Sequence, residues 1–310
     1  MDDPTKLEFA LSRRQLLRLG AASAVALATP LRALAADPTE ELPFFVLGDW
    51  GKANEGQAKV AAAMAEAAKR MPPRFIISVG DNFYPRGVTS TTDERWLSAF
   101  QNVYGSPALD CPWYAVLGNH DHLGNPSAEI EYGKLDSRWR MPSRFYSHSE
   151  PLADGKTAEF FFLDTTPLAK LNGVQAPSMT DPDQLYWLDR ALATSPARWR
   201  IVVGHHPVFS GGMHGNTPGL VARLKPLLDR HKVQVYLNGH DHDLQHIVFG
   251  GVHYLTSGAG ASARRSGNIA GTLFAAAKLG FLSIRLTPAK MSLSILDTGG
   301  NALHAAEIPV

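Results

Sequence analysis

The chain has 310 residues, of which 45% are hydrophobic and 19% charged, and this composition is typical of a soluble globular protein with a substantial core. Its formal net charge is +1, so no overall field favours nucleic acid or an anionic membrane, and we expect neither as a partner. The single cysteine, Cys111, cannot form an internal disulfide and is predicted to be a packing residue.

The N-terminal segment, residues 1–35, is predicted to be an export signal. Arg13 and Arg14 precede a mildly apolar run over residues 19–31, and Ala33-Leu34-Ala35 is a small-x-small cleavage pattern. The segment resembles a twin-arginine signal. An amphipathic helix or membrane anchor is less favoured, because the run contains many alanines, a glycine and a proline and is too short to span a bilayer. We therefore expect the mature protein to be exported, to the periplasm or the medium, without stable membrane association.

From residue 42 to residue 310 the chain is predicted to form one domain of alternating apolar strands and amphipathic helices. Strands are expected at residues 44–47, 74–79, 113–117, 200–203 and 233–237, and helices at residues 57–69, 94–104 and 181–192. Strand character without long intervening helices is found at residues 159–163, 245–249, 281–286 and 292–296. These four runs predict a second, more antiparallel sheet, and hence an α+β sandwich of two sheets with helices outside.

Five short clusters flanked by glycine close apolar, strand-like runs of this domain. They are Gly48-Asp49-Trp50-Gly51, Gly80-Asp81-Asn82-Phe83-Tyr84, Gly118-Asn119-His120-Asp121, Gly204-His205-His206-Pro207 and Gly239-His240-Asp241-His242. Because open α/β sheets gather their ligands at strand ends, we expect the carboxylates, imidazoles, amide and phenol of these clusters to lie close together. Together they predict a hydrolytic site that holds two metal ions.

Two of the clusters supply anionic donors. The Asp81 carboxylate is the ligand most able to bridge two cations, and Asp49 is expected to bind only one of them. A phenolate is a hard donor that forms readily only on a strongly acidic metal, so Tyr84, together with both carboxylates and His242, describes a ferric site. The three negative charges of this set match a trivalent cation.

The remaining donors are neutral. His240 and His242 stand two residues apart, so on an extended segment whose backbone turns between them both rings face one side and can serve adjacent metals. His205 contributes a nitrogen and Asn119 an oxygen. A metal bound by these two residues with Asp81 carries little ligand charge, which suits a divalent ion.

The clusters resemble those of the metallophosphoesterase superfamily. Asp49-Trp50-Gly51, together with Tyr84, resembles the purple acid phosphatase family, in particular its small, tartrate-resistant type, and the similarity extends over about residues 42–300. It implies a four-layer α/β/β/α sandwich of two mixed β-sheets flanked by helices. It also implies a dinuclear centre of Fe(III) and a second, divalent metal ion, which is Fe, Zn or Mn.

The resemblance assigns the ligands residue by residue. Asp49, Tyr84 and His242 would hold Fe(III), Asp81 would bridge, and Asn119, His205 and His240 would hold the divalent ion. His120 and His214 match positions that contact the substrate phosphate and assist the leaving group. His206 departs from the pattern, because small members of the family often have tyrosine at this position.

These inferences predict an acid phosphatase that hydrolyses small phosphate monoesters by attack of a metal-bound hydroxide. A trivalent ion lowers the pKa of bound water more than a divalent ion does, so we expect activity at acidic pH. Either His120 or His214 is expected to protonate the leaving oxygen, and Asp121 is expected to orient His120 through a hydrogen bond. The other histidines are expected to be packing or surface residues: His122, His148, His231, His246, His253 and His304.

Two alternatives stay open at this level. The same scaffold could serve an exported phosphodiesterase or nucleotidase, because the metals alone do not set the class of ester. A non-hydrolytic iron redox or metal-binding protein could keep the same ligands, although the retained His120 and His214 argue against it. The sequence gives no indication of oligomeric state.

Overall fold

The computed structural model describes residues 41–169 and 181–310, which belong to one compact unit. The predicted export signal, residues 1–35, lies outside the described residues. Within the described ranges, no helix is both long enough and apolar enough to cross a bilayer.

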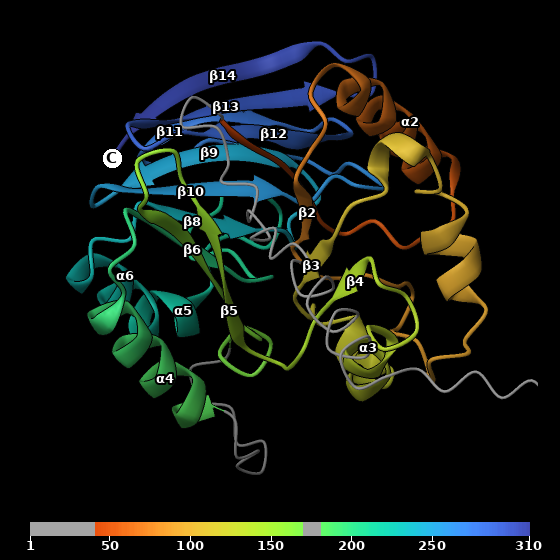
Figure 1. The fold of residues 1–310 in the computed structure, drawn as a ribbon, viewed down its shortest axis with the longest axis horizontal. Helices are drawn as coiled ribbons and strands as arrows, with labels where there is room; N and C mark the ends of the chain where they lie inside the picture. The colour runs from red at the N-terminus through yellow and green to blue at the C-terminus, as the bar shows by residue number, and fades with distance from the viewer. Residues whose placement is uncertain (1–40, 170–180) are drawn as a thin grey trace, which may run out of the picture. The chain divides into compact units, whose positions relative to one another are not determined.

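Two seven-stranded sheets form the centre of this unit (Figure 1). The first consists of β1 (Leu42–Leu47), β2 (Phe75–Ser78), β3 (Trp113–Ala115), β4 (Trp139–Arg140), β12 (Gly280–Leu286), β13 (Lys290–Asp297) and β14 (Ala302–Pro309). The second consists of β5 (Tyr146–Pro151), β6 (Thr157–Phe162), β7 (Trp199–Val203), β8 (Val235–Asn238), β9 (Leu244–Phe249), β10 (Val252–Ser257) and β11 (Thr272–Ala276). Their strand orders are β14-β13-β12-β1-β2-β3-β4 and β11-β9-β10-β8-β7-β6-β5.

Each sheet has a parallel centre that is extended by antiparallel strands. In the first sheet β1 to β4 run parallel, and β12, β13 and β14 add antiparallel pairs beside β1. In the second sheet β6, β7, β8 and β10 run parallel, while β5, β9 and β11 pair antiparallel at its two sides. Parallel strands are buried on both faces, which explains why β6 and β7 each end in an unbroken apolar run, at residues 160–162 and 201–203.

Helices cover the outer faces of the sheets. They are α2 (Glu55–Arg70) and α3 (Pro126–Tyr132) on the side of the first sheet, and α4 (Asp181–Thr194), α5 (Pro218–Arg223) and α6 (Lys225–Arg230) on the side of the second (Figure 1). Successive residues of β6 divide between two cores: Phe160 and Phe162 belong to the core between the sheets, and Phe161 belongs to the core shared with these last helices. The predicted four-layer sandwich of two mixed sheets is therefore confirmed.

The expected grouping of the four late strands is wrong. Residues 159–163 and 245–249 fall in the second sheet as β6 and β9, whereas residues 281–286 and 292–296 fall in the first sheet as β12 and β13. There is no separate antiparallel sheet among the described residues, because antiparallel strands extend the parallel centre of each sheet.

The helix expected at residues 94–104 is present, but it is not a regular α-helix. Trp96–Gln101 forms a π-helix in which the Asn102 N–H donates to the Leu97 carbonyl over 2.9 Å. Bonds of the α-helical type flank it, from the Ser98 N–H to the Glu94 carbonyl and from the Tyr104 N–H to the Phe100 carbonyl. Trp96 and Phe100 pack edge-on against Trp139, with ring centroids 5.2 and 5.3 Å away. This aromatic packing overrides the local preference for a regular helix.

Candidate metal centre

The five clusters follow parallel strands of both sheets. β1, β2 and β3 of the first sheet lead into the loops that carry Asp49, Asp81 and Asn119, and β7 and β8 of the second lead into those that carry His205 and His240. Parallel strands present their carboxyl ends at one edge of a sheet, so the loops of each sheet gather there. The hydrogen bonds described below show that the two sets of loops meet.

Three of the predicted ligands adopt a left-handed backbone conformation. The φ angles are 58° at Asp49, 50° at Asp81 and 71° at His240, a region that residues other than glycine occupy only at a cost. The costs are offset by interactions of the same loops: the Asp49 N–H donates to the Gly80 carbonyl over 3.0 Å, and the His240 N–H donates to Asp49 Oδ2 over 2.9 Å. The strained backbone turns these side chains out of the strand direction and toward the site.

Close packing explains two of the glycines. A Cβ atom at Gly118 would overlap Asp81 Oδ1, and a Cβ atom at Gly239 would overlap Asp49 Oδ2. Any side chain at either position would displace a carboxylate. The glycines of the clusters therefore serve close approach as well as tight turns.

One group of donors surrounds the Tyr84 hydroxyl. Its oxygen lies 2.8 Å from Asp81 Oδ2, 3.1 Å from Asp49 Oδ1 and 3.2 Å from His242 Nε2. His242 Nε2 in turn lies 3.5 Å from Asp49 Oδ1. The structure thus brings together the four residues that the sequence predicts for the ferric ion.

A second group surrounds His205 Nε2. This nitrogen lies 3.2 Å from Asn119 Oδ1, 3.2 Å from His240 Nδ1 and 3.5 Å from Asp81 Oδ1. His205 Nδ1 lies 2.9 Å from the Val79 carbonyl, which can only accept, so the ring proton is on Nδ1 and the Nε2 lone pair faces the site. Asp81 is common to both groups, with one carboxylate oxygen facing each.

The electrostatics of these donors fit a pair of cations. Burial raises the pKa of Asp49, and the nearby Asp81 raises it further, so two carboxylates are held together out of water. Burial also lowers the pKa of His205 and of His240, and it lowers the pKa of His242 to about 3, so all three imidazoles are neutral. Buried carboxylates are stabilised by nearby positive charge, and neutral imidazoles can offer a lone pair to a cation. This combination of donors is therefore one that metal ions stabilise.

The geometry alone also indicates a metal site. Ligand atoms of Asp49, Asp81 and His205 all lie within 4.8 Å of one another, and all three residues are buried. The residues present therefore fit the centre that the resemblance implies.

Sequence reasoning missed two residues beside the first group. Lys52 Nζ lies 4.5 Å from the centre of the Tyr84 ring and donates to Ser262 Oγ over 2.7 Å. Ser262 Oγ lies 2.7 Å from His242 Nδ1, so Lys52 and Ser262 position the His242 ring through the nitrogen that does not face Tyr84. The position of Lys52, directly after Asp49-Trp50-Gly51, was a usable signal, whereas nothing in the sequence around Ser262 marks it.

The two histidines that are predicted to contact substrate lie beside different groups of donors, His120 beside the first and His214 beside the second. The His120 ring packs 4.5 Å from the Tyr84 ring, and its Nε2 lies 3.9 Å from Asp81 Oδ2. The His214 ring lies 4.3 Å from the His240 ring. Each histidine thus borders the donor atoms of one group.

The expectation that Asp121 orients His120 is wrong. The buried Asp121 carboxylate accepts hydrogen bonds from the backbone N–H groups of Gly118, Asn82 and Phe83 over 2.8 to 3.1 Å. His120 Nδ1 instead lies 2.6 Å from the Pro85 carbonyl. Asp121 therefore fastens the loop after β2 to the loop after β3, because three backbone donors there need an acceptor.

The six other histidines pair with side chains that are not among the seven predicted ligands. His122 contacts Asp164 at 2.9 Å, His148 contacts Glu150 at 2.7 Å, and His231 contacts Asp189 at 2.6 Å. The other three form a chain: His246 Nδ1 lies 3.0 Å from His304 Nε2, and His246 Nε2 lies 2.9 Å from His253 Nδ1. This histidine network joins β9 and β10 of the second sheet to β14 of the first.

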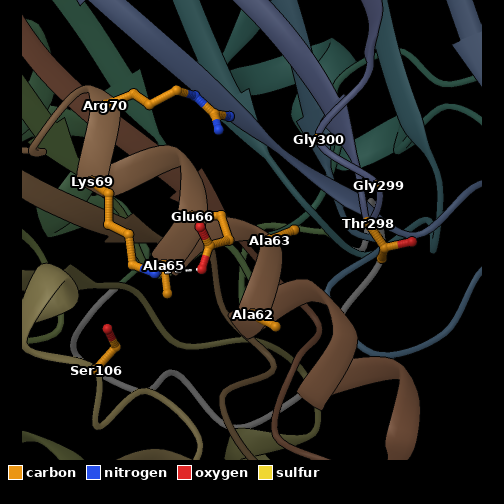
Figure 2. Close-up of a pocket in the computed structure, with 10 residues that line it drawn as sticks. All are labelled: Ala62, Ala63, Ala65, Glu66, Lys69, Arg70, Ser106, Thr298, Gly299 and Gly300. Atoms are coloured by element: carbon orange, nitrogen blue, oxygen red, sulfur yellow. Dashed lines mark hydrogen bonds and ion pairs between the residues drawn. The ribbon is translucent and has the colours of Figure 1, made fainter.

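A cavity of about 750 Å³ lies elsewhere, between α2 and the turn that joins β13 to β14 (Figure 2). Its walls carry mostly small side chains, and Figure 2 shows Lys69 turned toward Glu66, with which it forms an ion pair at 2.5 Å. None of the predicted site residues lines this cavity. It takes no part in the metal chemistry.

Comparisons with known proteins agree with this geometry. The calcineurin-like phosphoesterase family model matches residues 42–244. Purple acid phosphatase 4 of Arabidopsis thaliana is 37% identical over 297 residues, which cover 87% of this chain and 84% of that protein. Tartrate-resistant acid phosphatase type 5 of Sus scrofa is 35% identical over 300 residues, covering 88% of each. Among solved structures, GAP50, described as the anchor in the inner membrane complex of Plasmodium, matches with a TM-score of 0.80 and 26% identity, covering 87% of this chain and 89% of that one.

Proposed function

Because the chain belongs to the purple acid phosphatase family, within the calcineurin-like phosphoesterases, it is an acid phosphatase with a dinuclear metal centre, and we propose which ions and residues form that centre. Fe(III) is held by Asp49, Tyr84 and His242, with Asp81 as the bridging ligand. The second ion is divalent iron, zinc or manganese, held by Asn119, His205 and His240. The substrates are small phosphate monoesters.

The observation that carries the ferric assignment is the position of the Tyr84 hydroxyl, within 3.2 Å of donor atoms of Asp49, Asp81 and His242. Burial raises the pKa of Tyr84, and the two carboxylates raise it further. A phenolate can therefore form in this pocket only beside a strong positive charge, which a trivalent ion supplies. The second group offers neutral donors and one carboxylate oxygen, which supports a divalent ion there.

When bound, the two ions supply positive charge for the phosphate oxygens and increase the acidity of the attacking water. The chain's own residues position the substrate and move the proton. His120 Nδ1 donates to the Pro85 carbonyl, so its Nε2 is the atom left to exchange a proton with the substrate. Protonation of a leaving oxygen by such a group typically contributes about 10² to 10⁴ in rate.

The placement of His120 and His214 supports hydrolysis over a redox or storage role. Both rings border the donor groups, within 4.5 Å of the Tyr84 or His240 ring. Proton donors at these two places are useful to a reaction that expels an alkoxide, and electron transfer by the metals alone has no need of them.

The proposal is tested by metal loading and by the choice of ester. We expect protein loaded with iron and zinc to hydrolyse p-nitrophenyl phosphate at acidic pH in preference to bis(p-nitrophenyl) phosphate. Zinc cannot change oxidation state under these conditions, so activity with zinc in the divalent position excludes a redox requirement for that ion. Asp81→Ala is expected to lose both metals together, as measured by elemental analysis.

Asp154→Ala is the matched control, because it removes an exposed carboxylate that pairs with Arg198 at 2.8 Å, and it should keep both metals. A strong preference for the diester would overturn the choice of substrate class. Loss of only one metal from Asp81→Ala would show that Asp81 is not a ligand of both ions.

A further inference from the structure

His206 has no role in the centre as described so far, yet the structure fixes it in place. Its side chain is only 7% exposed, and its ring lies 4.4 Å from the His240 ring. Its backbone carbonyl accepts from the Tyr236 hydroxyl over 2.7 Å, and its backbone N–H donates to Thr165 Oγ1 over 2.9 Å. The ring is therefore held in a fixed position beside the second group of donors, which surrounds His205 Nε2.

The hydrogen bonds of Thr165 determine where His206 carries its proton. A threonine hydroxyl has two lone pairs and one hydrogen. Both lone pairs of Thr165 Oγ1 are used, because the backbone N–H groups of His205 and His206 donate to it over 3.1 and 2.9 Å. The hydroxyl hydrogen is left for His206 Nδ1, which lies 3.0 Å away and must accept. His206 is therefore in the tautomer with its proton on Nε2.

The Nε2–H group of His206 is a donor without a partner. Among residues 41–169 and 181–310, the ring of His206 makes no hydrogen bond besides the one through Nδ1. Although the residue as a whole is buried, the Nε2 atom is not among the enclosed unpaired atoms of the described residues, so it is accessible to an acceptor that enters the site. An anionic oxygen is the strongest acceptor for such a group.

We propose that His206 is a fixed, neutral hydrogen-bond donor for an oxygen of the phosphate group, in the monoester substrate and in inorganic phosphate. The inference rests on the proposed function, because it places phosphate at the metal centre. His206 then adds to the electrostatic stabilisation of the phosphate without costing reorganisation, because Thr165 and Tyr236 hold the residue before substrate arrives. It also differs from His120 and His214, since it donates without giving up its proton.

The first experiment compares two variants at equal metal content. His206→Phe keeps a ring against His240 and removes the donor, so we expect the inhibition constant of inorganic phosphate and the KM for p-nitrophenyl phosphate to rise about 10- to 100-fold. His206→Gln places an amide N–H near the position of Nε2 and should recover part of the affinity. Unchanged phosphate affinity in a fully loaded His206→Phe protein would overturn the role of His206.

The second experiment needs no variant, so it decides even if His206→Phe fails to fold. In zinc-loaded native protein, which is diamagnetic, imidazole ¹⁵N–¹H correlation spectra should place the His206 proton on Nε2, and added inorganic phosphate should shift that resonance. A proton on Nδ1, or no response to phosphate while the metals stay bound, would refute the inference. Native protein that binds no metal would instead refute the proposed centre and is recognised by elemental analysis.

Discussion

Tyr84 combines two contacts whose effects can be separated by removing one atom. Its ring packs beside His120 and beneath Lys52, while its hydroxyl meets the donors of the first group. Tyr84→Phe keeps the ring contacts and removes the oxygen. If the phenolate binds Fe(III), this variant should lose the visible charge-transfer band and hold iron less tightly, as measured by the absorption spectrum and by iron content.

The matched control for this prediction is Tyr114→Phe. Tyr114 is a half-buried tyrosine whose ring stacks 4.0 Å from the His148 ring, away from the seven predicted ligands. This control should keep both colour and iron. Colour that persists in Tyr84→Phe would show that the phenol is not a ligand.

At this scale, the sequence predicted the residues that the structure brings together, because each belongs to a short cluster that follows a strand and begins with a glycine. It could not predict their supporting residues. Lys52 and Ser262 are 210 positions apart and meet only through the fold. Nothing in the sequence distinguishes Thr165 from the other threonines, and only the folded structure brings three hydrogen bonds to its hydroxyl. Asp121 was assigned to the wrong partner, because a short motif does not show which backbone donors lack an acceptor.

Among the elements, the histidine network between β9, β10 and β14 makes stability depend on pH. His246 is fully buried, and burial, together with His253 and His304, lowers its pKa to about 3. Burial also lowers the pKa of His253 and of His304. An unfolded histidine titrates near 6.5, so the unfolded chain takes up protons first as the solution becomes acidic. The stability that these neutral rings provide is complete above about pH 6.5 and is lost as the pH falls toward 3.

His246→Leu should therefore weaken the pH dependence of unfolding. We expect the decrease in the free energy of unfolding between pH 7 and pH 5, measured with urea, to be smaller than in the native protein by about 1 to 2 kcal/mol. His231→Leu is the control, because His231 has a carboxylate partner, Asp189, at the surface. An identical pH dependence in His246→Leu and native protein would contradict the assignment.

Sequence pattern found the strands whose two faces are buried, and for a physical reason. β1 and β8 are largely apolar and buried, and β6 and β7 each end in a buried apolar run, while β4 has two residues and β11 is mostly half-buried, so neither of the last two carries a clear pattern. The short α5 and α6 also escaped prediction, since each has six residues. Which sheet a strand joins depends on its neighbours in space, and this is why β12 and β13 were assigned to the wrong sheet.

For the molecule as a whole, we propose export through the predicted twin-arginine signal. Replacing both Arg13 and Arg14 by lysine should leave the protein in the cytoplasm of a host that has this pathway, with its N-terminus intact. The native chain should appear outside the cytoplasm and begin near residue 36, as measured by cell fractionation and mass spectrometry. Arg18→Lys, in the same segment, should be exported normally. Equal export of the double variant and the native chain would count against the signal.

The centre draws on both sheets at once: Asp49, Asp81 and Asn119 come from one, and His205 and His240 from the other. None of the five clusters contains all the proposed ligands of either ion, so the proposed centre is complete only when both sheets are in place. If the chain is exported already folded, as proposed above, uptake belongs to the compartment of synthesis. The composition of the cytoplasmic metal pool, and not that of the surroundings in which the enzyme works, would decide which ion fills the divalent position.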